Sequence, residues 1–163
     1  MFERFGDLPL HVLVIHAAVV VLPVAALAAI VFALMPRWRW LLRWPVLALG
    51  LGAALTAFVA KQSGEAFVAA VPQLAQLVQE HKDRGTLLLW FSLGFAFVVL
   101  LAALVLSGPS ALASGRGAKA SGNRGLELVV SAAVVVMSLL VIWQTIRTGD
   151  SGAKAVWDGR LPS

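Results

Sequence analysis

The chain has 163 residues, of which 60% are hydrophobic and 13% charged, and its mean hydropathy is +0.89. A soluble domain carries roughly 25% charged residues, so this chain has too few polar side chains to cover its surface in water, and lipid must be part of its solvent. Its formal net charge of +5 does not indicate nucleic acid, because the basic residues lie at the ends of apolar runs, where they act as membrane anchors and topology signals. We therefore expect a single membrane domain over residues 1–163 and no nucleic-acid partner.

Four apolar runs predict four membrane-spanning helices. The first covers residues 8–35 and is too long for the core of a signal peptide, so we expect it to be retained. The second covers 45–60, and its Ala48, Gly50, Gly52 and Ala54 predict a small-residue face for close helix contact. The third and fourth cover 86–106 and 126–146. The expected fold class is all-α: an integral membrane four-helix bundle made of two helical hairpins.

The connections between the spans differ in character. Residues 36–44 alternate arginine with tryptophan, a combination typical of the lipid headgroup layer (Arg37, Trp38, Arg39, Trp40, Arg43 and Trp44). Residues 61–85 are polar, and the 3–4 spacing of their apolar positions predicts a short amphipathic helical segment between spans 2 and 3 that leads into span 3. Residues 107–125 are rich in Gly, Ser and Ala, which predicts a mobile linker.

Four spans place both termini and residues 61–85 on one side of the membrane and the other two loops on the opposite side. These two short loops carry six basic residues and no acid between the spans. Because basic residues concentrate in short cytoplasmic loops, we expect both termini to be extracytoplasmic.

A short internal repeat supports the two-hairpin arrangement. Span 2 is followed by Ser63-Gly64 and span 4 by Ser151-Gly152, each in an expected turn, and spans 1 and 3 both have histidine at their entry. Two similar hairpins side by side would bring these matched ends to one face.

Chemistry is expected where the histidines gather, since polar groups inside a membrane are costly and mark function. With no cysteine in the chain, a haem or metal would have to be held by histidine, methionine or carboxylate. His11 and His16 are five residues apart, about 140° around a helix, so they cannot both face one metal. His11 and His81 are closer in depth and form the better pair, which leaves His16 as a proton-linked or structural partner.

We therefore assign His11, His16 and His81 as candidate cofactor-binding residues. The same topology gathers a supporting polar cluster around them, made up of Lys61, Ser63, Glu65, Asp150 and Ser151. The pattern leaves the identity of any metal open.

Each candidate also has a structural interpretation. His16 would bond a neighbouring carbonyl or hydroxyl, His11 would anchor a helix end, and His81 would be a partly buried residue of a helix face. Lys61 and Glu65 form a surface pair at i,i+4, and Glu127, at the start of span 4, is favoured by the helix dipole and needs no other role. No Walker loop, dinucleotide-binding loop or GxSxG elbow occurs, so we expect no catalytic residue and no stand-alone enzyme.

The stretch Leu8-Pro9-Leu10-His11-Val12-Leu13-Val14-Ile15-His16 resembles the paired-histidine opening of a bacterial family of four-span membrane proteins, catalogued as domain of unknown function 2231. The resemblance continues through Ser63-Gly64-Glu65, His81 and the closing run 149–157. The chain departs from the family pattern at Val12, where proline is usual, and at Asp150, where histidine is usual. The resemblance implies a multi-pass protein of the bacterial inner membrane and makes the three histidines the positions to test.

Two functions are compatible with these observations. The first is a redox-linked electron-transfer protein that holds a b-type haem, or a metal ion, through histidines near the outer face, because imidazoles on facing helices of a bundle are suitable axial ligands. The alternative is a non-catalytic accessory or structural subunit of a larger membrane complex, whose partners besides the lipid bilayer would be other membrane proteins or further copies of this chain. Solute transport is less favoured, because the last three spans contain almost no polar residue near the midplane.

Overall fold

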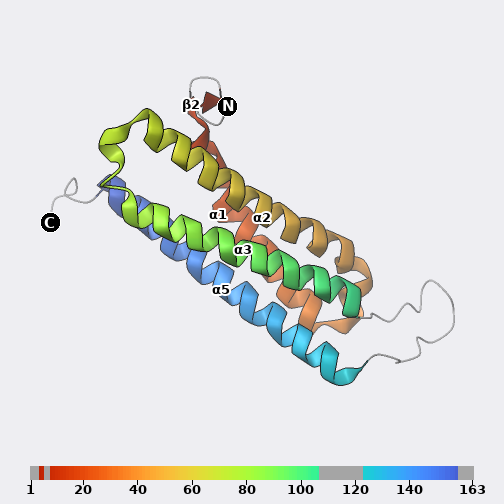
Figure 1. Cartoon of the computed structure of the whole chain (residues 1–163). Helices are drawn as coiled ribbons and strands as arrows, with labels where there is room; N and C mark the ends of the chain where they lie inside the picture. The colour runs from red at the N-terminus through yellow and green to blue at the C-terminus, as the bar shows by residue number, and fades with distance from the viewer. Residues whose placement is uncertain (1–3, 6–7, 107–122, 158–163) are drawn as a thin grey trace.

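A computed structural model describes residues 4–5, 8–106 and 123–157 (Figure 1). The linker expected at 107–125 lies outside the described residues except for its last three positions. A two-stranded antiparallel hairpin, β1 (Arg4–Phe5) and β2 (Leu8–Pro9), comes first, with Arg4 opposite Pro9.

Most of the remaining described chain is helical. Its long helices are α1 (Leu10–Leu34), α2 (Arg39–Ala70), α3 (Gln79–Val105) and α5 (Arg124–Trp157), and each is long and apolar enough to cross a membrane. The 3-10 turns η1 (Pro36–Trp38) and η2 (Pro72–Leu74) follow α1 and α2. Proline disfavours the helical conformation in the residue before it, so Met35 and Val71 leave the helical region and end these two helices.

The helices form the expected bundle of two hairpins. α1 and α3 both pack against α2 and α5 and lie diagonally opposite each other, as Figure 1 shows. The end at which α1 and α3 begin and α2 and α5 finish is called the histidine end below, and the opposite end the arginine end. Both described termini lie at the histidine end.

The internal repeat extends through the whole core. Every buried residue of α1 has a buried counterpart in α3 that lies 70 positions later, from Ala18 and Leu88 to Ala33 and Ala103. α2 and α5 correspond with a shift of 88, which relates Val46, Gly50, Ala53, Ala57 and Ser63 to Val134, Ser138, Val141, Thr145 and Ser151. The two hairpins are therefore related by a pseudo-two-fold axis that runs along the bundle.

The small-residue face of α2 differs from the expected one. Gly50 and Ala54 are buried, but Ala48 is exposed and a Cβ on Gly52 would meet nothing within 4 Å. The expected residues were spaced by two, which does not follow a helix face. The face that packs is Gly50, Ala53, Ala54 and Ala57, and a Cβ on Gly50 would lie 3.1 Å from Val99 of α3.

The helices extend further than the apolar runs. α2 continues to Ala70 instead of ending near 60, and the amphipathic segment expected before span 3 forms η2 and the first turns of α3, which enters the span without a break. Large exposed hydrophobic side chains cover the flanks, among them Leu104 and Leu128. On α2 this apolar stretch runs from Arg43 to Lys61, roughly 27 Å, close to the thickness of a bilayer core.

Candidate functional site

Two histidines meet at the histidine end. His11 lies in the first turn of α1 and His81 in the first turn of α3. Their ring centroids are 6.1 Å apart, and the ring planes make an angle of 71°. Because the two residues are equivalent under the shift of 70, the pair lies on the pseudo-two-fold axis, with one ring from each hairpin.

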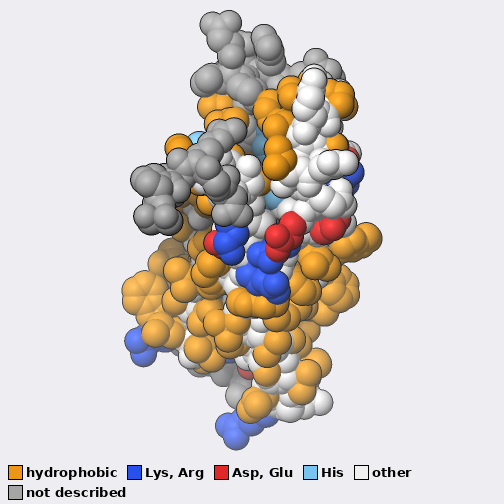
Figure 2. Space-filling model, turned by 90° about the vertical axis from the view of Figure 1, so that its left-hand side faces the viewer, with side chains coloured by type: hydrophobic (Ala, Val, Ile, Leu, Met, Phe, Trp, Pro, Cys, Tyr) orange, Lys and Arg blue, Asp and Glu red, His pale blue; other side chains and the backbone are white. Residues whose placement is uncertain are grey.

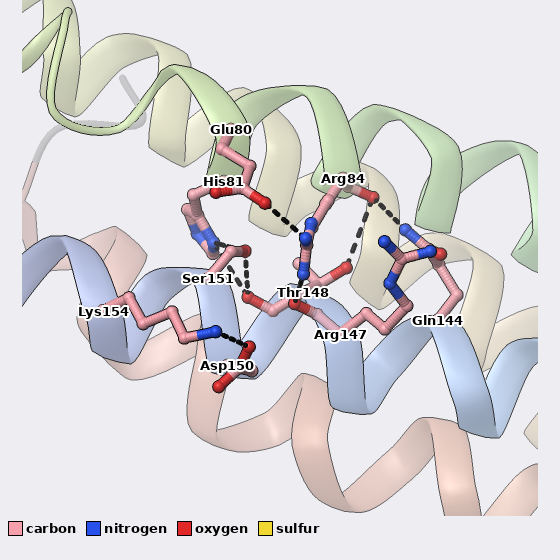
Figure 3. Close-up of polar contacts among 9 residues, drawn as sticks. All are labelled: Glu80, His81, Arg84, Gln144, Arg147, Thr148, Asp150, Ser151 and Lys154. Atoms are coloured by element: carbon pink, nitrogen blue, oxygen red, sulfur yellow. Dashed lines mark hydrogen bonds and ion pairs between the residues drawn. The ribbon is translucent and has the colours of Figure 1, made fainter.

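Each ring is held by the second helix of its own hairpin. The Nδ1–H of His11 donates to the carbonyl oxygen of Ala60 (3.1 Å), and Ser63 Oγ lies 3.3 Å from the same nitrogen. In the other hairpin His81 Nδ1 is 3.0 Å from the oxygen of Thr148 and 3.3 Å from Ser151 Oγ (Figure 3). A carbonyl oxygen only accepts, so in the neutral form of each ring Nδ1 carries the proton and Nε2 keeps its lone pair. Within the described part of the chain neither Nε2 makes a hydrogen bond.

A glycine lies beside each ring. A Cβ on Gly64 would lie 3.0 Å from Cε1 of His11, and a Cβ on Gly152 would lie 3.0 Å from Cε1 of His81. Contacts that short are tighter than most real Cβ contacts, so a larger residue at either position would force the ring to move by a few tenths of an ångström. The Ser-Gly motifs lie inside α2 and α5 and not in turns as expected. In each motif the serine contributes a hydroxyl and the glycine contributes space.

The second hairpin has an additional polar network beside its histidine. The carbonyl oxygen of Arg84 accepts from Gln144 Nε2 (2.9 Å) and Thr148 Oγ1 (3.3 Å). The Arg84 guanidinium donates to the oxygen of Arg147 (2.9 Å) and pairs with Glu80 (Figure 3). These contacts tie α3 to α5 one turn from His81. The positions equivalent to Arg84 and Thr148 in the first hairpin are Val14 and Ala60, which have no polar side chain, so His11 lacks this support.

His16 lies apart from the pair. Its side chain is exposed, and its Nδ1 bonds the carbonyl oxygen of Val12 in the same helix. This arrangement agrees with the angular argument that His11 and His16 cannot face one site.

The supporting polar cluster divides into two groups. Ser63 and Ser151 are buried and contact the histidine rings. Lys61 and Glu65 form the expected i,i+4 ion pair (2.6 Å), and Asp150 pairs with Lys154 (2.8 Å) on the exposed face of α5. The three charged residues of the cluster are thus engaged along their own helices.

The depth of the pair follows from its charged neighbours. Arg84, Arg147 and Lys61 border the apolar belt at this end, and His81 is one turn outside Arg84. A bilayer centred on the apolar belt therefore places the pair in the headgroup layer. Figure 2 looks toward this end of the molecule and shows charged side chains of both signs and some histidine surface among hydrophobic side chains.

The comparison with protein families covers nearly the whole chain. The family model described as "Predicted membrane protein (DUF2231)" matches residues 7–162, which include the His11–His81 pair and both Ser-Gly motifs. The chain belongs to this family. No curated protein and no solved structure matches it.

Among the described residues, the site of this DUF2231 protein offers two imidazole Nε2 atoms as possible ligands. Within the described ranges, no group of three or more His, Cys, Asp or Glu residues could hold a metal ion.

At the arginine end this DUF2231 protein has a second pair on the axis, which the sequence analysis missed. Arg39 is 6% exposed, and its guanidinium donates to the carbonyl oxygens of Phe32 (3.2 Å) and Ala33 (2.9 Å) and contacts Glu127 (3.3 Å). Arg39 was expected in the headgroup layer and Glu127 was given no partner. The available signal was that Glu127 follows Arg39 by 88 positions, the same interval that separates Ser63 and Ser151.

Proposed function

We propose that the His11–His81 pair binds a b-type haem near the outer face of the bacterial inner membrane and that the protein takes part in electron transfer. The observation that carries this proposal is the pairing of two imidazoles from different hairpins, each oriented by a backbone carbonyl at Nδ1. An Nδ1–H···O=C bond is the usual outer-shell contact of a metal-ligating histidine, because it fixes the tautomer and leaves Nε2 to bind.

The spacing of the rings is compatible with one metal between them. Two imidazoles whose nitrogens bind one ion, with metal–nitrogen bonds of about 2 Å, would have ring centroids at most roughly 6 Å apart. The observed separation is 6.1 Å.

The number of ligands favours haem over a bare ion. A structural zinc site uses four protein ligands and a catalytic one three, whereas a haem would bring most of the ligands of its own iron and would need few from the protein. When bound, the haem would supply one-electron redox chemistry. The two histidines would hold it, and the Ser-Gly motifs would keep the imidazoles in place.

The orientation rests on the distribution of basic residues. Arg37, Arg43 and Arg124 lie at the arginine end, and the positive-inside rule assigns that end to the cytoplasm. The histidine pair and both termini would then face the extracytoplasmic side.

The test is an optical spectrum of the detergent-purified protein, oxidised and then reduced with dithionite, before and after titration with haemin. We expect one haem per chain, with bands that shift on reduction. His11→Ala and His81→Ala should each abolish the six-coordinate spectrum, and His16→Ala should leave it unchanged, because His16 lies on the outer surface of α1. A protein that stays colourless after haemin addition would exclude haem binding.

One observation favours the accessory-subunit alternative. Each imidazole already joins two helices through its Nδ1 bond, so the pair could act purely as a structural clamp. In that case His11→Ala would lower the melting temperature of a colourless protein that copurifies with membrane partners.

A further inference from the structure

The two ends of the bundle balance their charges differently. Among the described side chains, the histidine end has five basic residues (Lys61, Lys82, Arg84, Arg147 and Lys154) and four acidic ones (Glu65, Glu80, Asp83 and Asp150). Three of these bases form ion pairs along their helices. The arginine end has four basic residues (Arg37, Arg39, Arg43 and Arg124) and one acid, Glu127, which contacts the buried Arg39. The charges of the described side chains therefore sum to +3 at the arginine end and to +1 at the histidine end.

The excess charge at the arginine end is concentrated where α1 is joined to α2. Arg37 and Arg43 are exposed, and in the described part of the chain neither has an acidic partner. The guanidinium carbon of Arg43 lies 5.9 Å from the ring centroid of Trp44. This cation–π contact keeps the Arg43 side chain at the surface.

Three exposed tryptophans surround these arginines. Trp38, Trp40 and Trp44 are 45%, 54% and 70% exposed. Indole rings concentrate at the headgroup level of a membrane because one edge donates a hydrogen bond while the ring remains in apolar surroundings. Their position, next to the start of the apolar stretch on α2, points to lipid and not to a soluble partner.

We propose that this surface, Arg37–Trp44, binds the headgroup phosphates of anionic phospholipids. Guanidinium groups form paired hydrogen bonds with phosphate oxygens, and among the described residues Glu127 is the one acid at this end of the bundle. Zwitterionic lipids offer the same phosphate but carry a compensating cation, so the surface selects lipids with net negative charge. This inference does not depend on haem binding.

The experiment is native mass spectrometry of the full-length protein after incubation with mixed micelles that contain equal amounts of phosphatidylglycerol and phosphatidylcholine. We expect the wild type to retain phosphatidylglycerol preferentially. A basic residue near an anionic membrane surface contributes roughly 5-fold to binding, so Arg37→Gln/Arg43→Gln should reduce the preference by up to about 30-fold. Raising the salt concentration should weaken the wild-type preference.

The matched control is Lys82→Gln/Arg147→Gln at the histidine end. It removes the same charge, and Arg147 makes a comparable contact with Trp143 (4.7 Å). The control should keep the wild-type lipid preference. Equal retention of both lipids by the wild type, or equal loss of preference in the two double variants, would overturn the proposal.

Discussion

Each histidine of the pair lies against a glycine, and a methyl group there would be in tight contact with the ring. A Cβ on Gly64 or Gly152 would lie 3.0 Å from the neighbouring imidazole. The serine before each glycine contacts Nδ1 of the same ring. The orientation of the rings thus depends on very small side chains as much as on the hydrogen bonds.

Gly64→Ala and Gly152→Ala should therefore shift the rings relative to their carbonyl acceptors and weaken the Nδ1 hydrogen bonds. Loss of an outer-shell contact typically weakens metal binding 10–100-fold, so we expect a drop of that order in haemin affinity, measured by titration. Gly52→Ala and Gly149→Ala are controls in the same helices, because a Cβ there meets nothing within 4 Å. These two should raise helix stability by about 0.5–1 kcal/mol and leave the affinity unchanged. Affinity losses that are equal in all four variants would argue against steric positioning.

Sequence reasoning identified part of this site. It selected His11 and His81 because both occur at the entry of a span, and it selected Ser63 and Ser151 because the Ser-Gly motif repeats. It did not show that these serines contact the rings, since both motifs were expected in turns. The hydrogen bonds from Gln144 and Thr148 to Arg84 were also missed. Their acceptor is a backbone carbonyl oxygen, which every residue has, so the sequence cannot indicate which residue will accept such a bond.

Among the elements, α1 and α2 are joined at the arginine end by a buried charge. The Arg39 guanidinium donates hydrogen bonds to two carbonyl oxygens in the last turn of α1. No later residue of that helix can donate to these oxygens, because the helix ends one or two residues further on. It also reaches Glu127 near the start of α5, so one side chain connects three helices.

Removing one partner of this ion pair should be costly. The Glu127 side chain is 28% exposed and that of Arg39 is 6% exposed. The free energy of unfolding should therefore fall by about 1–3 kcal/mol, which is less than the 3–5 kcal/mol lost when a fully buried pair is broken. A double-mutant cycle with Arg39→Met and Glu127→Gln, followed by unfolding in detergent, measures the coupling. The same cycle on Lys61 and Glu65 should give only about 0.3–0.5 kcal/mol. Equal coupling in both cycles would contradict the role we assign to burial.

The helix number and order were predictable, but the helix lengths were not. Hydropathy detects the part of a helix that faces lipid, so it ended span 2 near residue 60, whereas α2 continues to Ala70. The stop at Pro72 was a better boundary signal than the onset of charge at Lys61.

For the molecule as a whole, the absence of cysteine makes its orientation in the membrane directly measurable. Single cysteines at Leu77, in the connection from α2 to α3, and at Arg124, at the start of α5, lie at opposite ends of the bundle, and both positions are exposed. In intact cells, a membrane-impermeant maleimide should label Leu77→Cys but not Arg124→Cys, and both should react after lysis. The reverse pattern would place the histidine pair on the cytoplasmic side, and labelling of both in intact cells would contradict a membrane crossing by α3.

The pseudo-two-fold axis has a consequence for the origin of the site. A hairpin crosses the membrane twice and returns to the side on which it began, so a tandem duplication of one hairpin yields two copies with the same orientation, and any residue at its entry appears twice on a single face. Duplication of a unit with an odd number of crossings would have separated the two histidines by the full thickness of the bilayer. At the other end, two identical ancestral copies would have placed the same residue at both positions 39 and 127, like charge against like. In the present chain one position is basic and the other acidic, which favours association of two unlike halves over that of two identical ones.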